Sequence, residues 1–166
     1  MNFGRLFFVL VSLAALAPVS AHTVSFMIVE TGLPGEQGAS NKYGKSWEDG
    51  FFDVFFDAGH IVSNTPGLRL DTLPSAQFPV EAAESLSGAM EGGVDYFVLA
   101  LLDYREDGAA KSLEMPGPRQ ISLRLFSVNP FRFIREEKFA GYRKTQTGED
   151  FINAKQAAVK ILPYLE

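Results

Sequence analysis

The chain has 166 residues, of which 46% are hydrophobic and 21% charged, and it contains no cysteine. This composition is that of one ordinary globular domain, and the many apolar residues, 15 Phe among them, argue against intrinsic disorder. Without cysteine the chain forms no disulfide, thiol nucleophile or Cys-ligated metal centre, and its net charge of −5 disfavours nucleic acid and anionic lipid as partners.

The N-terminus has the pattern of a secretory signal peptide. One positive charge, Arg5, precedes an apolar run over residues 6–16, and small residues follow up to Ala21. The run is about 11 residues long, whereas a membrane-spanning helix needs roughly 20. We therefore expect residues 1–21 to be a signal peptide cleaved after Ala21. The mature chain, a single domain over residues 22–166, is then expected in the periplasm or outside the cell, without membrane insertion.

The first half of the mature chain predicts two strand–helix units. Residues 23–30 are apolar on both faces, as expected of a covered strand, and a glycine-rich loop follows. Ser46 and Asp49 form an acidic capping box for a helix over residues 47–58, which Gly59 ends. The next predicted segments are a short strand at 61–63, a proline-containing loop at 65–79 and a helix at 80–90.

The second half predicts a meander followed by a helix. Residues 94–104 are apolar on both faces and are the best candidate for the central strand. Residues 120–128 alternate as a strand does, and the tight turn at Asn129-Pro130 leads into an antiparallel strand over residues 131–142.

The last helix completes the predicted fold. Thr147 and Asp150 are expected to cap it, and its core stripe is predicted to comprise Phe151, Ile152, Ala158, Ile161, Leu162 and Leu165. The order is βαβαβββα. It predicts a two-layer α/β (α+β) domain with a mixed five-stranded sheet, two right-handed parallel crossovers and helices mostly on one face.

These elements resemble one group of bacterial envelope domains. The similarity involves a helix ending in DVFFDAGHIV, a helix leading into EGGVDYFVLALL, the strand pair ISLRLFSV and RFIREEKFAGY, and a terminal helix. The group comprises the N-terminal domain of TolB, the periplasmic part of CsgG, and LpoB. The resemblance covers about residues 23–165 and implies the fold, with binding to other envelope proteins rather than catalysis. It implies no cofactor and no catalytic residue. This chain lacks the lipobox cysteine of CsgG and LpoB and the propeller of TolB.

The first predicted helix has an unusually wide apolar surface. At 100° per residue, Phe52 and Phe56 fall beside its core stripe, and Asp49, Asp53 and Asp57 repeat every four residues on the remaining side. In one interpretation the proline-containing loop covers the two Phe and the Asp side chains are merely solvated. In the other, the Phe side chains anchor a partner protein and the Asp side chains steer a basic surface toward it. The second is the leading prediction: a non-enzymatic module that docks another envelope protein.

A first alternative is copper binding. After cleavage at Ala21, His22 would carry both an imidazole and a free α-amino group, a pair that chelates Cu(II). His60, the only other histidine, would lie at the same edge of the sheet if the second strand ran parallel beside the first. In the other interpretation, His22 belongs to a fraying terminus and His60 is a loop residue.

A second alternative is hydrolysis of nucleotides or phosphate esters. Gly38 and Gly44, followed by Lys45 and Ser46, imitate a P-loop, and Asp103 after an apolar strand imitates its magnesium-binding carboxylate. Five residues separate the two glycines, whereas the motif requires four. A glycine-rich crossover loop is the simpler interpretation.

Overall fold

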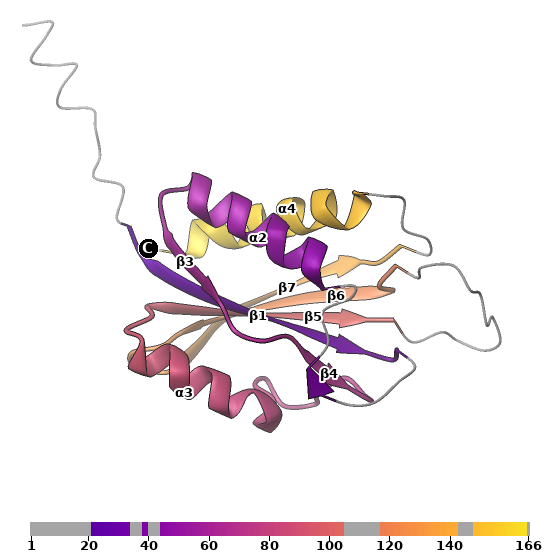
Figure 1. Cartoon of the computed structure of the whole chain (residues 1–166), viewed down its shortest axis with the longest axis horizontal. Helices are drawn as coiled ribbons and strands as arrows, with labels where there is room; N and C mark the ends of the chain where they lie inside the picture. Colours follow the sequence, from indigo (N-terminus) through magenta and orange to yellow (C-terminus); the bar gives the residue numbers. More distant parts are fainter. Residues whose placement is uncertain (1–20, 34–37, 40–43, 105–116, 143–147, 166) are drawn as a thin grey trace, which may run out of the picture.

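The structure is a computed structural model that describes residues 21–33, 38–39, 44–104, 117–142 and 148–165. Except for Ala21, the predicted signal peptide lies outside these residues, as does Thr147. Within the described ranges, one mixed sheet carries α-helices on its faces (Figure 1).

Seven strands are present in the described part of the chain. They are β1 (Thr23–Thr31), β2 (Gly38–Ala39), β3 (Ile61–Asn64), β4 (Leu68–Leu70), β5 (Tyr96–Asp103), β6 (Gln120–Ser127) and β7 (Arg132–Ala140). Their order is β2-β4-β1-β5-β6-β7, and β3 pairs with the first half of β1. β1 is parallel to β3, β4 and β5, whereas β5, β6 and β7 form an antiparallel meander. The five predicted strands are therefore all present.

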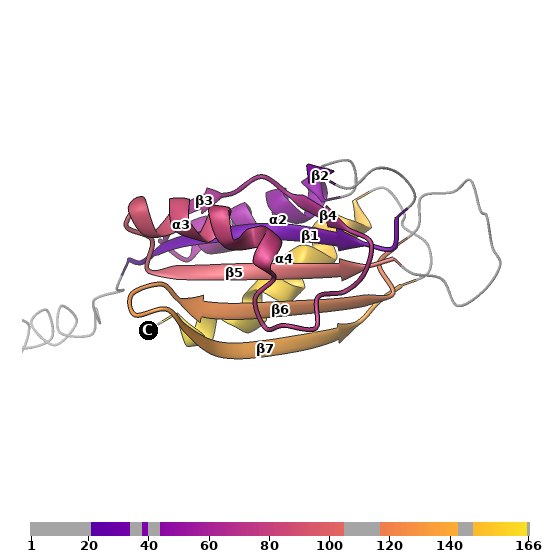
Figure 2. The same ribbon diagram turned by 90° about the horizontal axis from the view of Figure 1, so that it is seen from below.

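Two helices cover one face of the sheet. They are α2 (Lys45–Asp57) and α4 (Glu149–Ile161), the latter extended by a 3-10 turn, Leu162–Tyr164. α3 (Ala83–Glu91), preceded by the 3-10 turn Val80–Ala82, lies on the opposite face (Figures 1 and 2). The predicted α/β class and the placement of most helices on one face are confirmed.

The starts of α2 and α4 differ from the predicted caps. α2 begins at Lys45, and Gly44 occupies the cap position without a side-chain hydrogen bond, so Ser46 is not the cap. The closeness of β1 explains this start, since a Cβ on Gly44 would lie 3.1 Å from Ile28 Cγ2. α4 begins after Gly148, whose φ is +85°. Asp150 lies in the first turn and makes no cap hydrogen bond.

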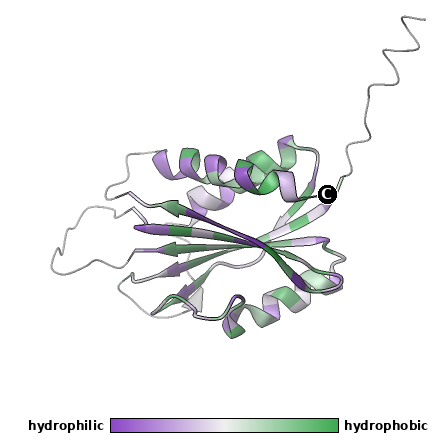
Figure 3. Cartoon of the chain, turned by 180° about the vertical axis from the view of Figure 1, so that it is seen from behind, coloured by the Kyte–Doolittle hydropathy of each residue, from purple (hydrophilic) through white to green (hydrophobic). Residues whose placement is uncertain are grey.

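The core has two parts, one on each face of the sheet (Figure 3). Under α2 and α4 the largest buried side chains are Trp47, Phe26, Phe51, Phe55, Ile28, Leu102, Leu123 and Leu125. On the α3 side they are Phe97, Phe126, Leu99 and Leu101. Two predicted core residues of α4 are not part of the core, because Ile152 is 55% exposed and Phe151 is only half-buried. Ala158 and Ile161 are buried as predicted, and Ala154 and Ala157 also turn inward.

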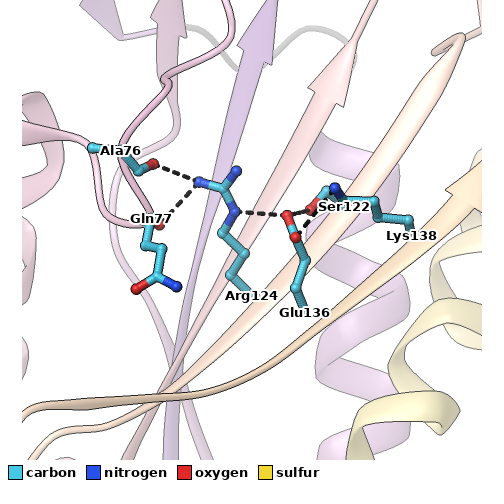
Figure 4. A network of polar contacts seen from close by, with 6 residues as sticks. All are labelled: Ala76, Gln77, Ser122, Arg124, Glu136 and Lys138. Carbon is cyan, nitrogen blue, oxygen red and sulfur yellow. Dashed lines mark hydrogen bonds and ion pairs between the residues drawn. The ribbon is translucent and has the colours of Figure 1, made fainter.

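A polar anchor holds the segment before α3 against the sheet (Figure 4). Arg124 on β6 donates from Nη1 to the carbonyl oxygens of Ala76 and Gln77, at 2.8 and 2.9 Å. Its Nε donates to Glu136 Oε1 on β7 at 2.9 Å. Nearby, the ring of Phe78 packs 5.3 Å from that of Phe126, centroid to centroid. The proline-containing segment is thus tied to the face of the sheet opposite α2.

Candidate functional site

The outer surface of α2 exposes aromatic side chains. Phe56 is 72% exposed. Phe52 is half-buried, and its ring packs edge to face against Phe26 with 5.1 Å between centroids. The sequence left open whether the segment 65–79 covers these rings. It packs on the other face of the sheet through Leu73 and Phe78, so it does not cover Phe56.

A shallow hollow of about 340 Å³ lies between α2 and α4. It is lined by Asp49, Phe52, Asp53, Phe56 and Phe151. Four of these five residues were predicted from the sequence to form one surface. Phe151 was instead predicted to belong to the core, and helical periodicity alone could not show that it faces Phe52 and Phe56 across an interhelical seam. The fifth predicted residue, Asp57, is exposed on α2 and does not line the hollow.

The hollow is acidic, and lysines of this chain balance part of its charge. Lys155 on α4 forms an ion pair with Asp53, which raises the pKa of the lysine, and its Nζ lies 5.5 Å from the centroid of the Phe151 ring. Lys45 Nζ lies 3.7 Å from an Asp49 carboxylate oxygen. Exposed ion pairs of this kind are weak, so a partner's Lys or Arg can replace the internal cation.

The start of β1 brings the two histidines together. Thr23 pairs with Ile61 in parallel register, and Ile61 N donates to the carbonyl oxygen of His22 at 2.9 Å. The backbone N–H of His22 donates to His60 Nδ1 at 3.3 Å. Asp95 Oδ2 accepts from Thr23 N at 2.8 Å and lies 3.8 Å from His22 Nδ1. His60 is buried, and this burial is the main cause that lowers its pKa. The nearby His22 lowers the pKa of His60 further.

Residues 40–43 of the imperfect P-loop lie outside the described residues, and the described residues of the motif do not come together. Lys45 is exposed at the start of α2, whereas Asp103 is buried and accepts a hydrogen bond from Thr31 Oγ1 at 2.9 Å. Strand alternation places Asp103 on the same face as Leu99 and Leu101, which pack toward α3. The lysine and the carboxylate therefore lie on opposite faces of the sheet.

A larger hollow of about 750 Å³ lies between β1, β3, β4 and α3. Hydroxyl groups of Ser25, Ser63 and Thr65 and the acidic side chains of Glu81 and Glu84 are on its walls. Among the described residues, no Lys, Arg or His side chain lines this hollow.

No protein-family model and no curated protein matches the chain. Similar solved structures include the PelC dodecamer from Paraburkholderia phytofirmans, at 13% identity and a TM-score of 0.47, covering 86% of this chain and 87% of that chain. The LpoB C-terminal domain from Escherichia coli is 12% identical, with a TM-score of 0.40 and coverage of 82% and 93%. TolB from Acinetobacter baumannii is 14% identical, with a TM-score of 0.39 and coverage of 87% and 30%.

The similar solved structures thus include LpoB and TolB, two of the proteins that the sequence resembles. At these identities the likeness is one of fold and says nothing about what this chain binds. Among the described residues, no helix combines the length and apolar composition needed to cross a bilayer.

Proposed function

We propose that this chain is a non-enzymatic binding module that docks another cell-envelope protein through the outer surface of α2. This docking surface comprises Asp49, Phe52, Asp53, Phe56, Asp57 and Phe151. The observation that carries the proposal is the exposure of Phe56, 72% of whose surface is open to solvent beside an acidic hollow. A large aromatic ring at the rim of a concavity is a typical anchor of protein–protein interfaces.

The chemistry of the surface favours one kind of partner. Such a partner presents an apolar or aromatic side chain that fills the hollow against Phe52 and Phe151, with Lys or Arg side chains around it. Lys155 already illustrates the second feature, because it pairs with Asp53 and approaches the Phe151 ring. A basic residue of the partner would make the same two contacts, and the acidic rim would speed the encounter at low salt.

Export places the module beside such a partner. We propose that residues 1–21 direct secretion and are removed after Ala21, leaving the domain of residues 22–166 in the periplasm or outside the cell. The test is the intact mass of the protein recovered from its own host. A mass that corresponds to a start at His22 supports this processing, whereas retention of the apolar run contradicts it.

The decisive variant is Phe56→Asp, with Val80→Asp as its matched control. Val80 is 80% exposed and lies in the 3-10 turn that precedes α3, on the opposite face of the sheet. Burying most of a Phe side chain contributes about 1.5–3 kcal/mol, so losing Phe56 is expected to weaken binding roughly 10- to 100-fold. The partner is first captured by crosslinking in the host, then purified, and its dissociation constant measured with each variant.

Three results together support the proposal. Val80→Asp binds the partner as tightly as the unmodified protein does. Phe56→Asp binds the partner at least tenfold more weakly. Raising the salt concentration weakens partner binding by the unmodified protein more than partner binding by the double variant Asp49→Asn/Asp57→Asn. Equal binding by Phe56→Asp and Val80→Asp overturns the proposed surface. Failure of the unmodified protein to capture any envelope protein overturns the docking function itself.

A further inference from the structure

The start of β1 holds a cluster of nitrogen atoms that the docking function does not use. We propose that removal of residues 1–21 creates a copper(II) site there, whose ligands are the new α-amino group and Nδ1 of His22 together with Nδ1 of His60. This site lies outside the α2 docking surface, and it rests on the proposed cleavage after Ala21. Signal-peptide cleavage would then be the step that makes the protein able to bind metal.

The parallel pairing of β1 with β3 supplies the geometry. The nitrogen of His22 lies 3.3 Å from His60 Nδ1, and the two imidazole rings are 5.9 Å apart between centroids. Two nitrogens that each bind one metal at about 2.0 Å lie roughly 2.8 Å apart when adjacent and 4.0 Å apart when opposite. The observed separation falls within that range.

Cleavage changes the chemistry of the decisive atom. In the uncleaved chain the nitrogen of His22 belongs to a peptide bond, and its N–H donates to His60 Nδ1. Among the described residues, no group of three or more His, Asp or Glu side chains forms a metal site. After cleavage the same nitrogen is an amine, whose pKa of about 7.7–8.0 allows it to lose a proton and bind a metal near neutral pH. The amine and Nδ1 of His22 then chelate the ion in a six-membered ring.

The surrounding contacts hold the new terminus in place. The carbonyl oxygen of His22 accepts from Ile61 N at 2.9 Å, and Thr23 N donates to Asp95 Oδ2 at 2.8 Å. The ring of Tyr96 packs edge to face against that of His22, with 5.1 Å between centroids. Residue 22 is thus fixed by backbone and side-chain contacts, unlike a fraying end. Fixing ligands before the ion arrives lowers the entropic cost of binding.

Electrostatics at the site favour a cation. The carboxylate of Asp95 lies 3.8 Å from His22 Nδ1 and supplies a negative charge beside the ligands. Nδ1 of His60 accepts the N–H of His22, so this nitrogen carries a lone pair, as a metal ligand must. Amine and imidazole nitrogens bind Cu(II) more tightly than the other divalent first-row metals, and a planar nitrogen set suits this ion.

The test compares two forms that differ in the position of the amine. The first begins at His22, and the second retains residues 17–21, so that its free amine is five residues away. Each is titrated with copper sulfate in a weakly coordinating buffer, and electron paramagnetic resonance reports the number of nitrogen ligands. The first form is expected to bind one equivalent of copper at least 100-fold more tightly than the second. His60→Gln in the first form should lose one nitrogen ligand and bind about 10- to 100-fold more weakly.

Three outcomes overturn the site. The first is equal copper affinity of the two forms, and the second is an unchanged spectrum and affinity in His60→Gln, with folding of each form checked by circular dichroism. The third is a mature chain from the host that begins at a residue other than His22. A partner-binding measurement on His60→Gln distinguishes failure of the copper site from failure of the docking proposal. This variant leaves the α2 docking surface intact and should bind the partner normally.

Discussion

Gly50 lets α2 and α4 approach each other closely enough to form one layer. A Cβ added at this position would lie 2.6 Å from Ala154 Cβ, 2.9 Å from the carbonyl oxygen of Phe151 and 3.3 Å from the backbone nitrogen of Lys155. Carbon atoms in contact normally lie about 3.5–4.0 Å apart. Because Cβ and backbone atoms cannot rotate away, Gly50→Ala must move one helix by about an ångström. The change would also widen the hollow between Phe56 and Phe151.

Two opposing effects set the magnitude for Gly50→Ala. Ala is favoured over Gly within a helix by about 1 kcal/mol, whereas overpacking a close contact costs about 1–3 kcal/mol. We expect a net loss of up to about 2 kcal/mol in the free energy of unfolding. Gly88→Ala is the matched control, because Gly88 is also inside a helix and a Cβ there would meet nothing within 4 Å. The control should gain up to about 1 kcal/mol.

Urea unfolding followed by circular dichroism measures both changes. The two variants should differ by about 1–3 kcal/mol, in opposite directions from the unmodified protein. Ala154→Gly removes the closest contact, so in a double-mutant cycle it should recover about 0.5 kcal/mol or more of the loss caused by Gly50→Ala. If Gly50→Ala proves as stable as Gly88→Ala, the close packing of α2 on α4 is refuted.

Three further predictions concern the core, the polar anchor and pH. Phe55→Ala, at a fully buried ring, should cost about 3–5 kcal/mol, measured by urea unfolding. Arg124→Met removes the hydrogen bonds to the segment before α3, so hydrogen exchange should accelerate over residues 71–79 while α2 stays protected. Burial lowers the pKa of His60 below 6.5, so the unfolded chain takes up a proton that the folded chain resists. Lowering the pH from 7.5 to 5.5 should therefore destabilise the unmodified protein more than His60→Gln, seen in their urea midpoints.

The strands were predictable where their own residues define a pattern. β1 and β5 are apolar on both faces because each lies between other strands with helices or loops over both sides of the sheet. β4 was missed because its three residues lie in a proline-containing segment, and only pairing with β1 and β2 makes them a strand. The start of α2 was missed for a related reason, because Gly44 lies close to Ile28 on β1 and no local pattern can reveal that contact.

The candidate site was predictable only in part. Helical periodicity indicated that Phe52 and Phe56 widen the apolar surface of α2, but it could not decide what covers them. That depends on the segment 65–79, which Arg124 and Phe78 hold on the other face of the sheet. Phe151 joins the surface through the packing of α4 on α2, a long-range contact without a sequence signal.

The end of α2 connects the docking surface to the histidine pair. Gly59, with a φ of +86°, ends the helix, its N–H donates to Phe56 O at 2.9 Å, and the N–H of His60 donates to Phe55 O at 3.1 Å. A residue with a Cβ is strained by about 1–2 kcal/mol at this φ. In Gly59→Ala, the turn is therefore expected to open, because opening relieves the strain on Ala. We therefore expect Gly59→Ala to weaken both copper binding and partner binding.

Gly93→Ala controls for strain alone. Gly93 has a φ of +71° after α3, and a Cβ there would meet nothing within 4 Å. Its loss of stability should be about 1–2 kcal/mol, while copper and partner affinities stay unchanged. Both affinities are measured by calorimetry at a temperature where each variant is fully folded. Unchanged affinities in Gly59→Ala would show that the turn sets neither the position of Phe56 nor that of His60.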